Sequence, residues 1–205
     1  VYGQADRMPI TENFPVKKSE SPYGETKQIC EGILKKFCEA NPLFNNITLR
    51  YFNPIGAHKS GMIGELPLCK PENLVPFLTQ TAIGKREQLV VFGDDYNTSD
   101  GTCIRDYIHI EDLAIVHVSC LEYLIQKKNK ANYEFYNVGT GKGLSVLELI
   151  NLFEKVNNIK INYKIGERRK GDVVIAFADV TKILKNVGWE CKYSVELSLI
   201  HISEP

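Results

Sequence analysis

Residues 133–148 read YEFYNVGTGKGLSVLE, and this stretch indicates the fold class. A β-prone run from Tyr133 to Val138 opens into three alternating glycines, and a helical pattern begins at Ser145. Ser145 with Glu148 three residues later forms a capping-box pair, which marks a helix start. The glycines lack the G-x-G-x-x-G spacing of a dinucleotide loop, and no acidic residue is placed to hold a ribose. The stretch therefore predicts a strand, a tight turn and a helix rather than a phosphate loop.

The same alternation of strands and helices extends along the rest of the chain. Further strands are expected at residues 47–52, 89–92, 107–110 and 160–165, the first ended by Asn53-Pro54. Helices are expected from Ser21-Pro22, over residues 74–83, from Asp112, over 145–156 and from Asp179 to Gly188. Because strands alternate with helices, the sequence predicts an α/β fold.

The composition excludes several classes of function. Lys plus Arg and Asp plus Glu each number 25, so no net charge favours nucleic acid or an anionic membrane. The chain has no apolar run near the roughly 20 residues of a membrane span. Its six cysteines form no C-x-x-C pair and no metal-ligand spacing, which predicts reduced thiols and no metal. These observations predict a cytoplasmic protein.

Tyr23 and Lys27 form the most informative pair for function. A spacing of four residues at the start of a helix places both side chains on one face, about one turn apart. A neighbouring ammonium favours the phenolate and lowers the pKa of a tyrosine, which suits it to proton transfer. Taken alone, the same spacing is also found on solvated helix edges. The pair therefore predicts a catalytic role only together with further motifs.

Both ends of the chain have unusual sequences. Val1-Tyr2-Gly3 has the pattern of a strand end entering a loop, which predicts an internal start. Residues 197–205, LSLIHISEP, match the translation of a sequencing-library adapter and are predicted not to be native. On that interpretation the apolar Leu197, Leu199, Ile200 and Ile202 have no evolved partner. The alternative is a genuine amphipathic tail.

Five further motifs follow Tyr23-x-x-x-Lys27 in order, and together they identify a family. They are Arg50-Tyr51-Phe52-Asn53-Pro54-x-Gly56-Ala57-His58, Glu72-Asn73-Leu74-Val75-Pro76, Phe92-Gly93-x-Asp95-Tyr96, Asp100-Gly101-Thr102-x-x-Arg105-Asp106-Tyr107-Ile108-His109 and Arg169-x-Gly171-Asp172. The chain resembles the UDP-galactose 4-epimerase family of extended short-chain dehydrogenase/reductases. This resemblance implies the C-terminal part of a Rossmann-type NAD-binding domain plus a smaller α/β substrate-binding domain. Residues 1–58 would end the first domain, and 59–196 would form mainly the second, with segments that return to the first.

The resemblance also implies the chemistry. NAD would be held tightly and reused, while the sugar is inverted at C4 through a 4-keto intermediate. Tyr23 would act as the base, Lys27 would bind the nicotinamide ribose, and Tyr51 would lie near the nicotinamide. A serine of the family pattern would precede Val1, and the glycine-rich NAD loop is expected upstream. The 205 residues alone are therefore expected to be inactive.

The substrates implied are UDP-galactose and UDP-glucose. The residues that would bind them are Tyr51, Phe52, Asn53, Asn73, Leu74, Val90, Val91, Phe92, Arg105, Arg169, Asp172 and Ala176. The two arginines would counter the diphosphate, since a guanidinium fork suits phosphate oxygens, and Asp172 would accept from the uridine ribose. In isolation, surface ion pairs would be the better explanation of these arginines.

Two positions depart from the family pattern. Glu72 stands where asparagine is frequent, which casts doubt on a direct role for that side chain. Ala176 occupies the position that faces the sugar 2-substituent, and a small residue there predicts that UDP-N-acetylhexosamines are accepted as well. The resemblance further implies a homodimer. Two alternatives remain, a related nucleotide-sugar dehydratase or decarboxylase, and a catalytically inactive UDP-sugar-binding protein of the same fold.

Overall fold

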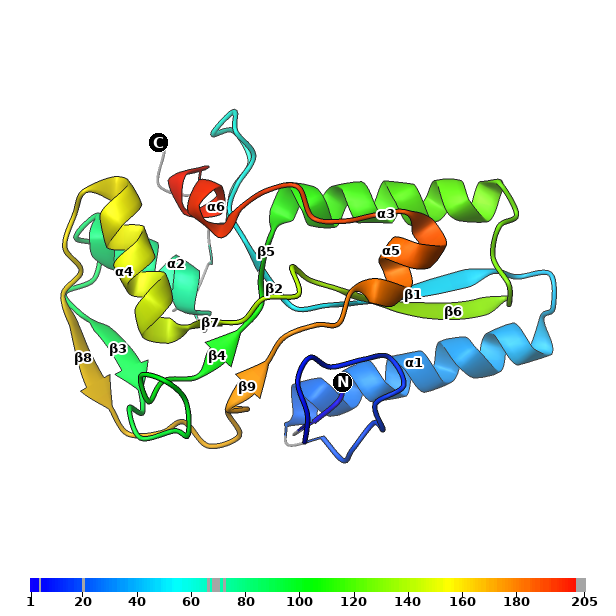
Figure 1. Cartoon of the computed structure of the whole chain (residues 1–205), viewed down its shortest axis with the longest axis horizontal. Helices are drawn as coiled ribbons and strands as arrows, with labels where there is room; N and C mark the ends of the chain where they lie inside the picture. The colour runs from blue at the N-terminus through cyan, green and yellow to red at the C-terminus, as the bar shows by residue number, and fades with distance from the viewer. Residues whose placement is uncertain (4, 20, 66, 68–70, 72, 202–205) are drawn as a thin grey trace.

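The computed structural model describes the chain except for residues 4, 20, 66, 68–70, 72 and 202–205. Cys69, Glu72 and Ile202 therefore lie outside the described residues. The described elements form two groups, each with its own hydrophobic core, joined by short strands (Figure 1). The parallel strand pairs of the chain, with helices packed against them, confirm the predicted α/β class.

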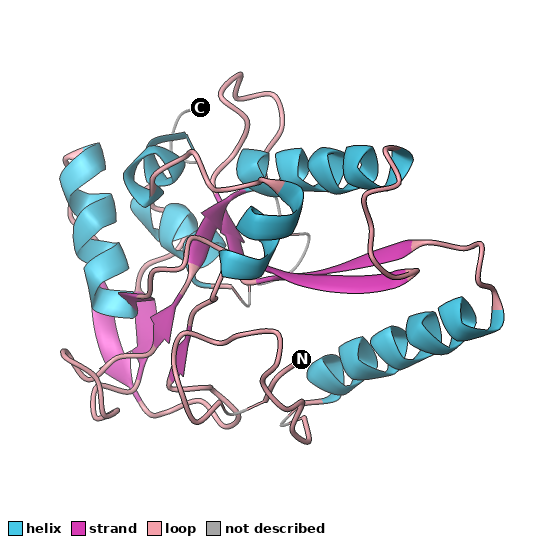
Figure 2. Ribbon diagram, turned by 45° about the vertical axis from the view of Figure 1, so that its right-hand side comes forward, coloured by secondary structure: helices cyan, strands magenta, loops and turns pink. Residues whose placement is uncertain are grey.

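The first group is built on β1 (Asn46–Tyr51) and β6 (Tyr133–Val138), which pair in parallel from Asn46↔Tyr133 to Tyr51↔Val138. Helix α1 (Pro22–Ala40) lies on one side of this pair, and α3 (Ile110–Ile125) with α5 (Thr181–Val187) lies on the other (Figure 2). Tyr136 and Val138 of β6 are fully buried against α3 and α5. The core of this group therefore lies on the side of α3 and α5.

The second group is built on β3 (Leu89–Phe92) and β8 (Tyr163–Gly166), again a parallel pair. Three helices accompany it, namely α2 (Leu74–Ala82), α4 (Val146–Asn157) and α6 (Val195–His201). Leu78, Ile150 and Phe153 have no exposed surface and form the centre of this core. Burial of such side chains contributes about 1.5–3 kcal/mol each.

Short strands connect the two groups. Strand β2 (Asn53–Ile55) pairs in parallel with β5 (Tyr107–His109). Strand β4 (Ile104–Arg105) lies between β7 (Leu144–Ser145) and β9 (Ile175–Ala176). The expectation that Asn53-Pro54 ends the strand is therefore incomplete, because the chain changes partner there and pairs again. Pro54 is tolerated because β2 has only one neighbour in its sheet, so the missing N–H breaks no second ladder.

Several predicted boundaries are confirmed by local contacts. The Ser21 hydroxyl accepts a hydrogen bond from the Gly24 amide at 3.1 Å and caps α1, with Pro22 in the first turn. Both halves of the Ser145–Glu148 capping box are present at α4. Two elements begin later than predicted, β8 at Tyr163 and α5 at Thr181. Asp179 instead accepts from the Thr181 amide at 2.8 Å, just before the helix.

The C-terminal residues 195–201 form α6 against β5 and α4. Leu199 has 0% of its surface exposed and belongs to the same core as Phe153. The expectation that the apolar side chains of residues 197–200 have no partner is therefore wrong for Leu199. The adapter origin of residues 197–205 stays a prediction.

Two further facts concern the described residues. None of their helices combines the length and the apolar character that crossing a bilayer requires. Cys30, Cys38, Cys103, Cys120 and Cys191 are free thiols.

Candidate functional site

A cavity of about 640 Å³ lies between the second group and the connecting strands. The carboxyl end of β3 and the start of α2 form much of its wall, and β2 and β4 contribute from the connecting strands. It is lined by residues 53–55, 71, 73–77, 89–92, 103, 105, 107, 146, 169 and 172. Because ligands of α/β proteins bind beyond the carboxyl ends of parallel strands, this is the expected position for a binding site.

The cavity brings together most of the predicted substrate residues, which are far apart in the sequence. These are Asn53, Asn73, Leu74, Val90, Val91, Phe92, Arg105, Arg169 and Asp172. Tyr51, Phe52, Ala176, Tyr23 and Lys27 are not among its lining residues. Tyr51 and Phe52 directly precede Asn53, and Ala176 pairs with Arg105 in the register of β9 and β4. The predicted residues therefore fall into three sets: those that line the cavity, those that adjoin it in the chain or the sheet, and the separate pair Tyr23 and Lys27.

The cavity has an apolar wall and a basic rim. Val90 to Phe92 supply the wall, while Arg105 and Arg169 supply positive charge. Arg169 binds Asp172, with its Nη2 donating to Oδ1 at 2.7 Å and its Nε at 3.1 Å. Its guanidinium also lies 5.7 Å from the centre of the Phe92 ring. Such a rim suits a ligand that combines a flat apolar ring with an anionic group.

Sequence reasoning missed Cys103 and Tyr107, which also line the cavity. Both are buried, and burial raises the pKa of the Tyr107 hydroxyl. Cys103 and Tyr107 lie on either side of Arg105 at alternate positions of the chain. The alternation of side chains between the two faces of an extended segment could therefore have identified them. Residues 103, 105 and 107 share one face of such a segment, and that face is the wall of the cavity.

Tyr23 and Lys27 lie one turn apart at the start of α1, with the Lys27 Nζ 5.0 Å from the centre of the Tyr23 ring. Both side chains are exposed, Tyr23 with 71% of its surface. The predicted shared face is therefore confirmed, and the hydroxyl and ammonium groups are open to a ligand.

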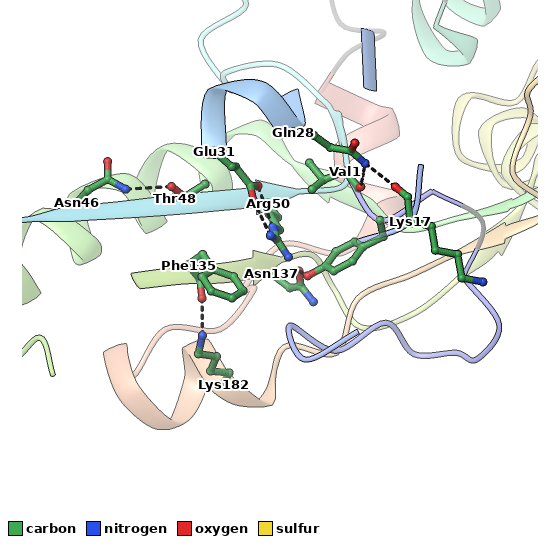
Figure 3. Close-up of polar contacts among 11 residues, drawn as sticks. Val1, Lys17, Gln28, Glu31, Asn46, Thr48, Arg50, Phe135, Asn137 and Lys182 are labelled. Atoms are coloured by element: carbon green, nitrogen blue, oxygen red, sulfur yellow. Dashed lines mark hydrogen bonds and ion pairs between the residues drawn. The ribbon is translucent and has the colours of Figure 1, made fainter. Parts of the chain in front are cut away.

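Polar contacts fix the helix that carries this pair (Figure 3). The Gln28 amide donates to the carbonyl oxygens of Val1 at 2.6 Å and Lys17 at 2.8 Å. One turn further, Glu31 receives a two-pronged bond from Arg50 of β1, with Nε–Oε1 2.8 Å and Nη2–Oε2 2.5 Å. The Arg50 and Glu31 side chains are only 8% and 14% exposed. The register of α1 on β1, and with it the position of Tyr23, is therefore set by charge as well as by apolar packing.

Asp106 connects the segments around residues 140 and 178 next to the cavity. Its buried carboxylate accepts four hydrogen bonds, from the Thr140 amide and hydroxyl, the Gly141 amide and the Ala178 amide, at 2.6–3.1 Å. A Cβ at Gly139 would lie 2.4 Å from its Oδ2, so a side chain there would displace it. These contacts confirm that residues 139–143 form a turn. Amides that could have bound a phosphate are occupied by Asp106.

Asp106→Asn should lower the free energy of unfolding by about 2–3 kcal/mol. The reason is that each carboxylate oxygen accepts from two donors, and the amide nitrogen would face one pair of them. Urea denaturation of the full gene product that carries this chain measures the loss. Asp6→Asn is the matched control, because Asp6 forms an exposed ion pair with Lys17 and should change stability by less than about 0.5 kcal/mol. Equal losses in both variants would contradict this account of Asp106.

Parallel strand pairs with a cavity beyond the carboxyl end of β3 define the class of α/β proteins whose ligand sites lie at strand ends. The chain belongs to the family described as GDP-mannose 4,6 dehydratase, whose model matches residues 1–200. It is 51% identical, over 95% of its length, to the UDP-glucose 4-epimerase of Dictyostelium discoideum, of which it covers 56%. The chain thus spans little more than half the length of the curated relatives it matches.

Solved structures agree with this assignment. UDP-glucose 4-epimerase from Stenotrophomonas maltophila, with bound NAD and formylated UDP-arabinopyranose, superposes with a TM-score of 0.94 and 40% identity. That match covers 99% of this chain and 59% of the other. The UDP-Glc/GlcNAc 4-epimerase of Campylobacter jejuni gives 0.78 and 35% identity, over 98% of this chain and 60% of the other. The resemblance to UDP-hexose 4-epimerases that the motifs indicated is confirmed.

The residues present fit one end of a nicotinamide dinucleotide. The exposed hydroxyl of Tyr23 and ammonium of Lys27 are suitable donors for ribose hydroxyls. A pyrophosphate needs free backbone amides in a glycine-rich turn, and the amides of Thr140 and Gly141 are bound to Asp106. Among the described residues, the fit therefore extends to the nicotinamide ribose, and that turn does not serve the pyrophosphate.

Proposed function

We propose that the full gene product carrying this chain is a UDP-glucose 4-epimerase that interconverts UDP-galactose and UDP-glucose with bound NAD. The observation that carries the proposal is the cavity, which gathers residues of five separate motifs around an apolar wall and a basic rim. The 51% identity to a UDP-glucose 4-epimerase over 95% of the chain supports it, as does the 40% identity to a solved one over 99% of the chain.

In this proposal the cavity holds the nucleotide. Val90 to Phe92 pack against the uracil, and Arg105 and Arg169 neutralise the diphosphate. Asp172, whose Oδ1 accepts from the Nε and Nη2 of Arg169, accepts from the uridine ribose as well. Asn53 and Asn73 supply amide groups to the cavity lining.

The proposal gives proton transfer to Tyr23. Its phenolate takes the proton of the sugar 4-hydroxyl as C4 is oxidised. It returns the proton after the 4-keto sugar has rotated to present its other face. Lys27 favours the phenolate by its charge, and Lys27 and Tyr51 would hold the nicotinamide end of NAD, with Lys27 donating to the ribose hydroxyls. NAD, when bound, supplies the reversible hydride acceptor that this oxidation requires. No proton, hydride or atom is gained or lost over the full cycle.

Product analysis tests the proposal. The full gene product, incubated with UDP-galactose and NAD, should form UDP-glucose, which a dehydrogenase-coupled absorbance assay detects. A dehydratase would instead release a product lighter by one water, and a decarboxylase would act only on a UDP-uronic acid. Tight UDP binding without any turnover would favour a catalytically inactive binding protein. We expect the 205 residues alone to bind no NAD and to show no turnover.

We further propose that the full gene product is a homodimer in the cytoplasm, with residues 1–58 ending the NAD-binding domain and 59–196 forming mainly the UDP-sugar domain. Ile29, Ile33 and Phe37 form an exposed apolar row on α1, which supports association through that helix. Free thiols support a reducing compartment. Sedimentation of the full gene product as a monomer would contradict the homodimer.

A further inference from the structure

Arg168 makes a set of contacts at the rim of the cavity, although it is not one of the lining residues. Its Nε donates to the Asp95 Oδ1 at 2.6 Å, and its Nη2 donates to the Asp95 carbonyl oxygen, also at 2.6 Å. Its guanidinium lies 4.2 Å from the centre of the Tyr96 ring. Arg168 thus connects the segment after β8 to the segment after β3.

These contacts cover the end of the strand that forms the cavity wall. Gly93 follows Phe92 with a positive φ of 79°, and its amide donates to the Gly166 carbonyl oxygen at 2.9 Å. A Cβ at Gly93 would lie 2.7 Å from the Tyr96 ring and 2.9 Å from the Arg168 Cγ. The Tyr96 and Arg168 side chains therefore fill the space at the carboxyl end of β3, and only glycine fits at position 93.

Arg168 and Arg169 are neighbours in the loop after β8, and they bind different partners. With Arg168 bound to Asp95, Arg169 faces the cavity, where it binds Asp172 and approaches Phe92. Tyr96 gives a second connection: burial, followed by the nearby Cys103 and Asp172, raises the pKa of its hydroxyl. Cys103 and Asp172 both line the cavity, so Tyr96 joins the Arg168 contacts to its wall.

We propose that Arg168 is a positioning residue for nucleotide binding, which holds Arg169 and Asp172 at the cavity rim by binding Asp95 and covering Tyr96. This inference rests on the proposed function, because that function assigns Arg169 to the diphosphate. The Arg168 and Asp95 side chains are 49% and 69% exposed, and ion pairs this exposed contribute little to folding. We infer that they act by fixing the direction of the Arg169 side chain. A mobile Arg169 side chain would lose conformational entropy when it binds the diphosphate, and this loss would weaken binding.

Calorimetric titration of the full gene product with UDP tests this role. Arg168→Ala should weaken UDP binding about 5- to 10-fold, because Arg169 and Asp172 then lose their fixed direction at the cavity rim. KM for the UDP-sugar should rise by the same factor while kcat stays within about 2-fold, since Arg169, through which Arg168 acts, binds substrate and transition state alike. Arg168→Lys, which keeps the charge but not the fork, should fall between. Lys160→Ala, which removes an ion pair with Glu154 elsewhere on the same group, should leave UDP affinity unchanged.

A double-mutant comparison separates positioning from direct contact. In an Arg169→Ala background, Arg168→Ala should produce almost no further loss of UDP affinity, because the residue through which it acts is gone. Additive losses would overturn the inference, as would a single variant with unchanged UDP affinity. If Arg168→Ala lowers both Tm and kcat and leaves KM unchanged, the role of Arg168 is merely structural. If the wild type epimerises and Arg168→Ala leaves UDP affinity unchanged, this inference alone fails. If the wild type binds no UDP, the proposed function fails with it.

Discussion

Tyr23→Phe should lower the kcat of the full gene product about 1,000-fold while UDP affinity stays within about 2-fold. The substitution removes the single oxygen that transfers the proton and leaves the ring in place. Tyr23 is exposed at the start of α1 and does not line the cavity, so loss of its hydroxyl leaves the nucleotide contacts intact. Steady-state kinetics with UDP-galactose and calorimetry with UDP measure the two effects separately.

The control for this prediction is a second tyrosine of the same group. Tyr133 begins β6, at the end of the strand opposite the carboxyl edge, so Tyr133→Phe should leave kcat nearly unchanged. Near-normal turnover in Tyr23→Phe would remove Tyr23 from the proton-transfer role. A loss of UDP affinity equal to the loss of kcat would assign Tyr23 to uniform binding instead.

Local signals explain why so much of the fold could be predicted. The Ser21 cap, the Ser145–Glu148 box and the glycine turn are short-range patterns, and each was found where the sequence placed it. The strand at Asn53–Ile55 could not be read in this way, because its partner lies 54 residues further along the chain. A proline within a short segment indicates a break locally, and only the distant β5 shows that the strand resumes.

The site was predicted to a similar depth. Motif residues identified most of the cavity, since each binding segment carries its own recognisable pattern. The role of Asp106 was not predictable, because the donors that surround it come from the segments around residues 140 and 178. The burial of Leu199 likewise depends on α4 and β5, which its own sequence does not indicate. Long-range packing decides these features, and composition carries no trace of it.

Substrate breadth depends on Ala176, which is half-buried on β9 beside Arg105 of the cavity. Wild-type full gene product should epimerise UDP-N-acetylglucosamine as well as UDP-glucose, and Ala176→Tyr should reduce kcat/KM for the N-acetyl sugar at least about 100-fold. Packed surroundings resist even one added methylene, so a phenol at this position would occupy the volume that an acetamido group needs. The unmodified hexose lacks that group, and its kcat/KM should change by less than about 3-fold.

A size control makes the test selective. Ala176→Ser keeps the side chain small and should retain both activities, which separates volume from any general effect of substitution at this strand. Phe177 follows directly, and a second variant, Phe177→Leu, tests whether that ring rather than residue 176 limits the space. If Phe177 sets the limit, wild type will be inactive on the N-acetyl sugar and Phe177→Leu will gain that activity. A wild type inactive on the N-acetyl sugar rejects the assignment of Ala176, whichever residue then proves to fill the pocket.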